Sequence, residues 1–298
     1  AAWSTKNHPK EMKVDFAISE FGGVQLSPGN FILSVGEKGA AWIRISFKGT
    51  SGAASMPYKI NNPVTKAAKA AMRIEKYKTP IDTKYLKFLA KGFGASFFQR
   101  ILLSNKFLLP IALKQLFKTN PSMARGLHSL SRMTIAPTRI ESGIKTNVIP
   151  SHSFIDVDIR MLPGQNYEYI ISHLKKAIGK KLAKEADFKQ LTEEEGIITF
   201  GNESPTKSEF VSAMAQALNE IFPNSTLIPT IAYGATDLRF IRELGGNGYG
   251  FSLIDPVLTL DDLLKLPHGT NERVSLKCIE LTLDIYYKLA RIFLMEKN

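Results

Sequence analysis

The sequence predicts an α/β protein that carries an inserted α+β unit. Short apolar runs alternate with amphipathic helical stretches, strand-like segments return in the middle of the chain, and Asn-Pro and Pro-Gly pairs separate them. The 298 residues are 44% hydrophobic, which is enough to bury a sizeable core in two domains. We place the α/β domain at residues 1–36 and 201–298 and the insert at 37–200.

The α/β domain begins with a strand that ends at a carboxylate. Val14 to Ser19 is an apolar run that stops at Glu20, before Gly22-Gly23, as a buried strand stops at a loop. Phe31 to Val35 predicts a second strand. Residues 1–9 contain neither an initiator Met nor the basic-then-apolar pattern of a signal peptide, so we interpret the start as an internal position.

The insert is predicted from strands that alternate with helices. Ala41 to Lys48 alternates like a half-exposed strand, and Thr65 to Tyr77 is a helical stretch rich in Ala, Lys and Glu. Strand patterns return from Thr134 to Met161, Tyr167 to Ile178 has apolar residues at helical spacing, and Ile197 to Phe200 adds one more strand. This order of elements indicates a small layered α+β unit.

The most apolar region, Tyr85 to Phe117, is predicted to be buried or interfacial helix. A membrane span needs about 20 apolar residues without charge, and charged residues interrupt every window of this region. A surface-lying amphipathic segment remains the alternative. The interrupting residues are Lys87, Lys91, Arg100, Lys106 and Lys114.

The end of the chain completes the α/β pattern. Thr206-x-x-Glu209 predicts a capping box at a helix start. A strand at Thr226 to Ile231, a short helix at Asp237 to Leu244 and a closing helix at Val274 to Met295 follow.

Charge and cysteine usage limit the function classes. The net charge is +12, but the basic residues are scattered, and the densest group, Lys175 to Lys184, fits the solvated face of a helix better than a nucleic-acid site. The single cysteine, Cys278, excludes an intrachain disulfide and a cysteine metal cluster. A reducing, cytoplasmic location fits this usage.

Five segments, in order along nearly the whole chain, resemble the metallopeptidase family that includes carboxypeptidase S, glutamate carboxypeptidase, succinyl-diaminopimelate desuccinylase and the aminoacylases. The apolar helical insertion at residues 102–117 is most similar to the carboxypeptidase S branch. The resemblance implies a partial α/β zinc-peptidase catalytic domain with an inserted ferredoxin-like lid, through which the protein dimerises. The segments are Asp15 to Gly23, Lys48 to Pro57, Thr146 to Pro150 with Asp158 to Gly164, Tyr233 to Phe240, and Leu266 to Glu272.

The resemblance also implies a metal site. In the family, two zinc ions about 3.5 to 4 Å apart bind a water and polarise the scissile amide, and cobalt or manganese are alternatives. Glu20 corresponds to a carboxylate ligand of one ion and His268 to the imidazole ligand of the other; otherwise each is an ordinary loop residue. Gly234 and Thr236 correspond to a substrate-binding helix start, whose alternative is a plain helix cap.

Two lid residues resemble those that bind the free carboxylate of the substrate, often in the neighbouring subunit's site. They are Asn147, an amide donor, and Arg160, a planar fork suited to carboxylates. The alternative for Asn147 is a turn residue before Pro150. The alternative for Arg160 is an ion pair with Asp156 or Asp158 on the strand.

The sequence departs from the family pattern in two places. The His-x-Asp pair and the Glu-Glu pair of relatives, which supply metal ligands and the general base, fall upstream of Ala1, so no catalytic base is assignable. Where relatives have Gly-His-x-Ser, this chain has Ala53 in the position of the histidine. That histidine stabilises the oxyanion across the dimer interface, and losing such a donor costs about a hundredfold or more in rate.

The favoured hypothesis is a metal-dependent hydrolase of N-acyl amino acids or short peptides, here truncated or split and inactive alone. The alternatives are a catalytically impaired homologue that binds carboxylate ligands or dimerises, and a polyanion-binding module. Expected partners are a homodimer mate through the lid and a complementary N-terminal piece, without nucleic acid or membrane.

Overall fold

A computed structural model describes residues 1–191, 199–258 and 270–295, and the chain divides into two compact units. Unit 1 comprises Ala1–Glu37, Ile81–Ser131 and Asn202–Asn298, and unit 2 comprises Lys38–Pro80 and Arg132–Gly201. The outer limits of unit 2 lie within a residue of the predicted insert. The middle segment groups with unit 1 instead, because its first helix packs on the sheet of that unit.

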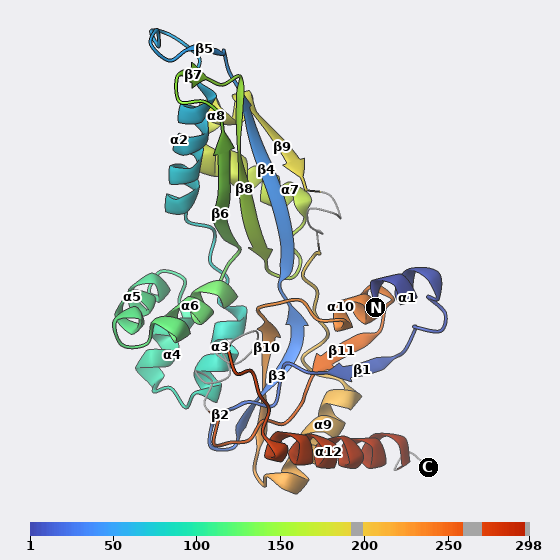
Figure 1. Cartoon of the computed structure of the whole chain (residues 1–298). Helices are drawn as coiled ribbons and strands as arrows, with labels where there is room; N and C mark the ends of the chain where they lie inside the picture. The colour runs from blue at the N-terminus through green and yellow to red at the C-terminus, as the bar shows by residue number, and fades with distance from the viewer. Residues whose placement is uncertain (192–198, 259–269, 296–298) are drawn as a thin grey trace. The chain divides into compact units, whose positions relative to one another are not determined.

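Unit 1 is built on a mixed sheet with the strand order β1-β11-β3-β10 (Figure 1). β1 is parallel to β11, and β3 is parallel to β10. The two pairs join where β11 lies antiparallel to β3. One row across the sheet joins Ser19, Gly250, Ser34 and Thr230. The strands are β1 (Phe16–Ser19), β2 (Gln25–Ser27, antiparallel to β3), β3 (Asn30–Glu37), β10 (Thr226–Ala232) and β11 (Asn247–Gly250).

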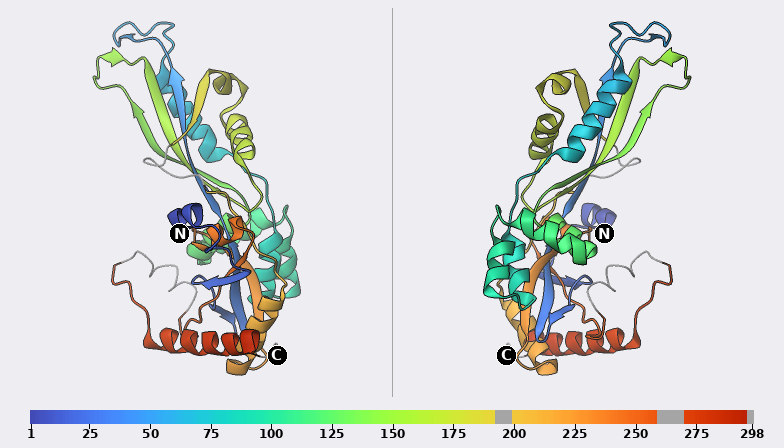
Figure 2. Two further views of the ribbon diagram at one scale, coloured as in Figure 1. Left: turned by 90° about the vertical axis from the view of Figure 1, so that its right-hand side faces the viewer. Right: turned by 90° about the vertical axis from the view of Figure 1, so that its left-hand side faces the viewer.

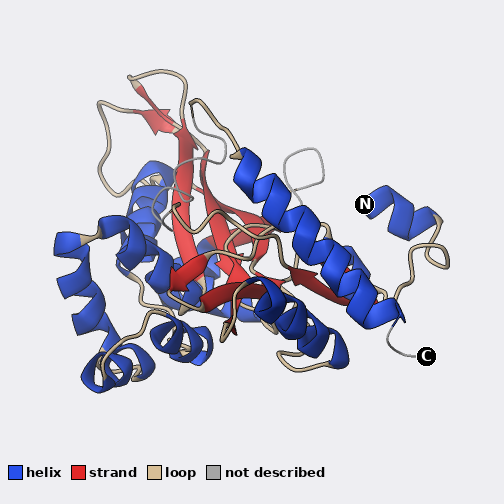
Figure 3. Cartoon of the chain, turned by 90° about the horizontal axis from the view of Figure 1, so that it is seen from below, coloured by secondary structure: helices blue, strands red, loops and turns tan. Residues whose placement is uncertain are grey.

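Helices cover this sheet as the apolar patterns predict. In the closing helix α12, the stripe Cys278, Leu281, Ile285 and Leu289 is buried, and α12 packs against α9 (Figure 3). The helices of unit 1 are α1 (Ala2–Asn7), α3 (Lys84–Gly92), α4 (Phe97–Ser104), α5 (Leu109–Thr119), α6 (Pro121–Leu130), α9 (Glu209–Ile221), α10 (Leu238–Glu243) and α12 (Leu276–Ala290), which continues as a π-helical turn at Arg291–Met295.

The predicted capping box is wrong by two residues. α9 begins at Glu209, and its N-cap is Ser208, whose hydroxyl accepts a hydrogen bond from the Val211 amide at 3.1 Å. Thr206 therefore lies outside the helix. The Ser208 hydroxyl is also 3.1 Å from the hydroxyl of Tyr249 on β11, so a tertiary contact fixes the cap at this residue.

Unit 2 is a layered α+β unit, as predicted. Its antiparallel sheet has the order β6-β8-β4-β9, and α2 and α7 cover one face (Figure 2). Between the two layers lies a core that includes Ile43, Ile155 and Leu174. The elements are β4 (Gly39–Lys48), β5 (Gly52–Ala53), α2 (Pro63–Lys76), β6 (Thr134–Ser142), β7 (Val148–Ile149), β8 (His152–Met161), α7 (Tyr167–Ile178), α8 (Lys180–Glu185) and β9 (Ala186–Gln190).

Two further sequence predictions involve residues 192–198 and 259–269. Half of the strand predicted at Ile197 to Phe200 lies outside the described residues, although Thr199 forms an isolated bridge with Ala40. His268 also lies outside them. Within the described part of the chain, none of the helices combines the length and apolarity that crossing a bilayer requires.

Candidate active site

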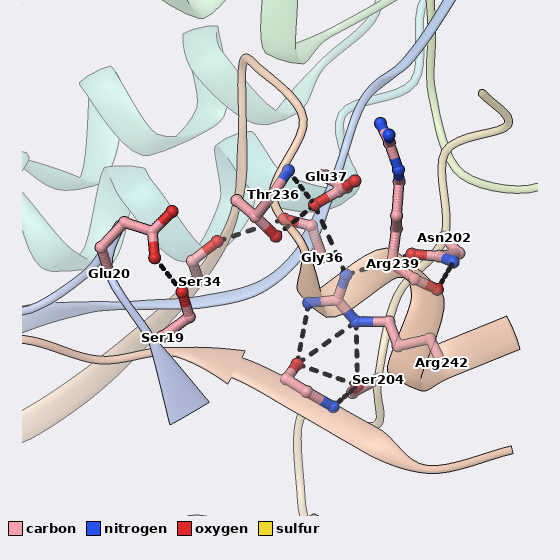
Figure 4. A network of polar contacts seen from close by, with 11 residues as sticks. Ser19, Glu20, Ser34, Gly36, Glu37, Asn202, Ser204, Thr236, Arg239 and Arg242 are labelled. Carbon is pink, nitrogen blue, oxygen red and sulfur yellow. Dashed lines mark hydrogen bonds and ion pairs between the residues drawn. The ribbon is translucent and has the colours of Figure 1, made fainter. Parts of the chain in front are cut away.

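Glu20 lies directly after β1, on a loop that requires glycine at position 22. Its carboxylate is exposed and accepts a hydrogen bond from the hydroxyl of Ser19 (Figure 4). A Cβ on Gly22 would be 2.1 Å from the carbonyl oxygen of Gly250, far closer than any van der Waals contact. The glycine therefore lets the chain turn away against β11 and leaves the Glu20 side chain at the strand end.

A small polar pocket brings two of the sequence-predicted site residues together. Its volume is about 260 Å³, and Glu20 and Thr236 both line it. Asp237 and Arg239, from the loop after β10 and the start of α10, complete its charged lining. The tertiary structure thus joins segments that are more than 200 residues apart in sequence.

A larger apolar cavity adjoins the same carboxylate. It has a volume of about 550 Å³, and Glu20 and Ala235 line it as well as the polar pocket. Most of its lining residues are aliphatic or aromatic, and they include Leu89 of α3 with Met123 and Leu127 of α6. Glu20 therefore stands where a polar pocket meets an apolar one.

The loop that carries Gly234 and Thr236 is held by a buried carboxylate that the sequence reasoning missed. Glu37, at the end of β3, is 2% exposed, and its Oε2 accepts hydrogen bonds from the amide and the hydroxyl of Thr236 at 2.7 and 2.5 Å (Figure 4). Burial raises the pKa of Glu37, although Thr236 and Arg242 oppose the shift. Both donors of Thr236 are therefore used within the protein, and Asp237, not Thr236, is the N-cap of α10.

Arg242 neutralises Glu37 from the helix that follows. Its Nη1 is 3.7 Å from Glu37 Oε2, and the two side chains are 4% and 2% exposed. The guanidinium also donates to Asn202 Oδ1 at 3.1 Å and to the carbonyl of Gly248 at 2.8 Å. This network ties β3, β11 and α10 together beneath the polar pocket. The sequence signal that was available is the charged pair Glu37-Lys38 between two apolar strands.

In unit 2, Arg160 adopts the alternative contact named from the sequence. Its Nε and Nη2 donate to the two carboxylate oxygens of Asp158 at 2.8 and 2.9 Å, and the indole N–H of Trp42 donates to the same carboxylate at 2.8 Å. Asp156 pairs with Arg44 instead. The Arg160 side chain is 37% exposed, and its Nη1 does not take part in the fork, so a further acceptor can reach it.

Asn147 and Ala53 lie next to each other at one end of unit 2. Ala53 pairs with Val148 in the β5–β7 ladder, and the Ala54 amide donates to the carbonyl of Asn147 at 3.0 Å. Arg160 is near the other end of β8, eight residues beyond His152 (Figure 1). At about 3.4 Å per residue this separates the ends by roughly 27 Å. One small carboxylate therefore cannot contact Asn147 and Arg160 of the same chain.

The described residues do not form a complete metal site. Zinc takes three or four protein ligands, and within the described ranges no group of three His, Cys, Asp or Glu side chains could hold a metal ion. Glu20 provides one carboxylate, and His268 lies outside the described residues. Both ligand assignments remain predictions from the resemblance.

Comparisons with known proteins agree on one family. The sequence model of the peptidase dimerisation domain of M20 peptidases matches residues 35–186, half of the chain. Probable carboxypeptidase S-like 2 of Dictyostelium discoideum is 29% identical over 264 residues, which cover 87% of this chain and 48% of that protein. The human N-fatty-acyl-amino acid synthase/hydrolase PM20D1 is 26% identical over 265 residues, with 87% and 50% covered.

Solved structures share the fold at low sequence identity. Aminopeptidase PepT from Bacillus cereus has a TM-score of 0.59 and 16% identity, covering 95% of this chain and 58% of that chain. The M20 family metallo-carboxypeptidase Sso-CP2 from Sulfolobus solfataricus also has a TM-score of 0.59 and 16% identity, covering 98% and 66%. The chain spans about half the length of the curated relatives it matches.

Proposed function

Because the chain belongs to the M20 peptidase family, we propose that it forms part of a metal-dependent hydrolase that cleaves amide bonds in N-acyl amino acids or short peptides. The observation that carries this proposal is the position of Glu20 at the junction of a polar pocket and an apolar cavity. A substrate with a polar amide next to an apolar acyl group or side chain fits such a junction.

We assign Glu20 and His268 as ligands of two divalent ions, zinc with cobalt or manganese as alternatives. Bound ions of this kind supply Lewis-acid polarisation of an amide carbonyl. The remaining ligands and the general base would come from residues that this sequence does not contain. The chain alone is therefore expected to retain well below two zinc ions and to show no turnover.

The substrate carboxylate is assigned to Arg160 and Asn147. Arg160 is already oriented by its fork with Asp158, which leaves Nη1 for a ligand oxygen. Because Asn147 lies beside the β5–β7 ladder and Arg160 lies near the far end of β8, a shared ligand requires two chains. We therefore propose a homodimer through unit 2 in which Asn147 serves the site of the neighbouring subunit.

An exposed stripe on α12 supports the proposed complementary piece. Leu276, Ile279, Leu283 and Tyr287 follow one another at helical spacing and are 53 to 78% exposed, on the side opposite the buried stripe. Exposed apolar stripes of this length mark surfaces that another element covers. We propose that an N-terminal piece of the α/β domain packs there.

The second candidate function is a homologue that binds a carboxylate ligand or dimerises without hydrolysing it. The observation that favours it is Ala53, whose methyl group on β5 cannot donate a hydrogen bond to an oxyanion. Under this alternative, ligands bind the chain and its dimer, but supplying the upstream segment produces no hydrolysis.

Calorimetric titration of N-acyl amino acids of increasing acyl length into the chain tests the proposed substrate class. Each methylene that enters the cavity is expected to tighten binding by up to about fourfold, because burying it gains about 0.8 kcal/mol. Met123→Lys places a charge in the cavity wall and should abolish this dependence, whereas Met72→Lys, at a position 57% exposed in unit 2, should leave it unchanged. Affinity that is independent of acyl length would remove the cavity from the proposal.

Zinc retained after dialysis tests the ligand assignment. Glu20→Ala should lower the zinc content, and Glu11→Ala, which removes another exposed carboxylate, should not. Equal zinc in the Glu20→Ala variant and the unaltered chain would remove Glu20 as a ligand. Hydrolysis assays with the upstream segment co-expressed then separate the active enzyme from the binding-only alternative.

A further inference from the structure

The helices of Ile81–Ser131 carry positive charge without any negative charge. From Lys84 to Leu130 the sequence contains eight Lys and Arg residues and no Asp or Glu. The chain as a whole has 39 basic and 27 acidic residues, so this exclusion of acids is local. A segment with this composition attracts a negatively charged surface.

The outer face of α4 is apolar and exposed. Phe97 is 81% exposed, Phe98 68% and Ile101 39%, and their spacing of three and four residues places them on one side of the helix. Arg100 is also exposed and lies beside them. The start of α4 is fixed by a capping box between Ser96 and Gln99, so this face is presented on a well-formed helix.

The apolar exposure continues through the α4–α5 connection and along α5. Phe107 is 75% exposed in the connection, and Ile111 is 66% exposed on the first turn of α5. Ile111 shares its face with Lys114 and Lys118, at three and seven residues' distance. The Lys106 ammonium lies 5.2 Å from the centre of the Phe107 ring, so basic and aromatic groups interleave.

These side chains are not part of the core of the helical segment. The buried residues of these helices are Leu109 and Leu113 on α5 and Ala124, Leu127 and Leu130 on α6. Ile111 lies on the side of α5 opposite Leu109 and Leu113, so the exposed residues form an apolar surface in addition to the core. Large apolar groups gathered in this way mark an interaction site on a folded protein.

We propose that this α4–α5 surface, formed by Phe97, Phe98, Ile101, Phe107 and Ile111 with the basic residues around them, docks onto an anionic phospholipid bilayer. Aromatic and aliphatic groups enter the boundary between headgroups and acyl chains, and Lys and Arg face the acidic headgroups. α4 has 8 residues and α5 has 11, so both lie in the interface and neither crosses the membrane. This proposal takes up the surface-lying alternative that the sequence left open for residues 85–117.

Two other occupants fit the same surface less well. A second copy pairing through this face would place positive charge against positive charge, which opposes association. Single-stranded nucleic acid would pair with the basic residues and stack on the phenylalanines, but Ile101 and Ile111 offer it no stacking surface. A bilayer uses both the charges and the aliphatic groups.

Vesicle co-sedimentation of the full 298-residue chain tests the proposal. We expect binding to phosphatidylcholine vesicles that contain about 30% phosphatidylserine, and binding at least about tenfold weaker without it. Lys106→Glu with Lys114→Glu should weaken binding by about 25-fold or more, about fivefold for each basic residue removed. Phe97→Ser with Phe107→Ser should weaken it by about tenfold or more, because two rings no longer enter the interface.

Matched variants in unit 2 give the controls. Lys180→Glu with Lys181→Glu changes the net charge equally at exposed positions, and Tyr58→Ser removes a ring that is 82% exposed. Both should bind as the unaltered chain does, and all variants should keep its circular dichroism spectrum.

Several outcomes would overturn the proposal. Three concern the vesicles: no binding, equal binding to neutral and acidic vesicles, or equal losses in the test and control variants. Two concern other occupants. The chain could bind single-stranded DNA in preference to vesicles, or it could form an oligomer that does not bind vesicles and that the phenylalanine variants dissociate.

Discussion

Replacing Arg242 by methionine should destabilise unit 1 strongly. The variant keeps an unbranched side chain, although a shorter one, and removes the charge that lies 3.7 Å from Glu37. At an effective dielectric constant of about 20, two unit charges at this distance attract each other by about 4.5 kcal/mol. Removing one partner of a buried pair costs about 3 to 5 kcal/mol, since the other charge stays buried without compensation. We expect a loss of this size in the free energy of unfolding.

The loss should depend on pH, because Glu37 can avoid the cost of a buried negative charge by taking up a proton. Burial already raises the pKa of Glu37, and without Arg242 it rises further above the value in the unfolded chain. A group with a raised pKa in the folded state contributes stability below its unfolded pKa and loses it as the pH rises through the folded pKa. The Arg242→Met variant should therefore lose more stability at pH 8 than at pH 5.

Urea unfolding followed by circular dichroism at the two pH values measures both effects. Lys277→Met is the matched control, because it breaks a pair with Glu280 at 3.2 Å whose side chains are 56% and 67% exposed. Such exposed pairs contribute about 0 to 1 kcal/mol. A loss below about 1 kcal/mol in Arg242→Met, or a loss equal at the two pH values, would refute the reasoning.

Three further predictions concern single positions. Burial, followed by the nearby Arg160 charge, lowers the pKa of Lys38 from 10.5 to about 7. Between these pH values the unfolded chain binds more protons than the folded chain, so the free energy of unfolding should rise with pH by up to about 1.4 kcal/mol per pH unit. Urea titrations across this range, with Lys38→Met as the reference, measure the rise. Gly22→Ala should lower the free energy of unfolding by about 3 kcal/mol or more, because its Cβ would lie 2.1 Å from a backbone oxygen. Gly234→Ala, with open space around it, should lower it by less than about 1 kcal/mol. Similar midpoints of the two variants in thermal melts would contradict the tight turn at Gly22. Ser208→Ala should destabilise α9 by about 1 kcal/mol and Thr206→Ala by much less, in the same thermal melts. A larger loss in Thr206→Ala would show that Thr206, and not Ser208, caps the helix.

The elements predicted best are those with a clear apolar period. The runs at Phe31 to Val35 and Ala41 to Lys48 became β3 and β4, and Tyr167 to Ile178 is α7 with the predicted bounds. β11 was not predicted, because Asn247–Gly250 is a glycine-rich segment whose extended form comes from pairing with β1. The β-strand propensities of its residues do not predict such a strand.

For the candidate site, the sequence by itself determined that Glu20 ends a strand and that Gly22 follows it, because both depend on residues close together in the chain. Only the tertiary structure decided that Glu20 and Thr236 share a pocket, and that Glu37, 199 residues before Thr236, holds its loop. Buried charges are placed by partners that are distant in sequence, and a local pattern does not contain them. The same holds for Asn147 and Arg160: the sequence showed their resemblance to substrate-binding residues, and the fold places them at opposite ends of unit 2.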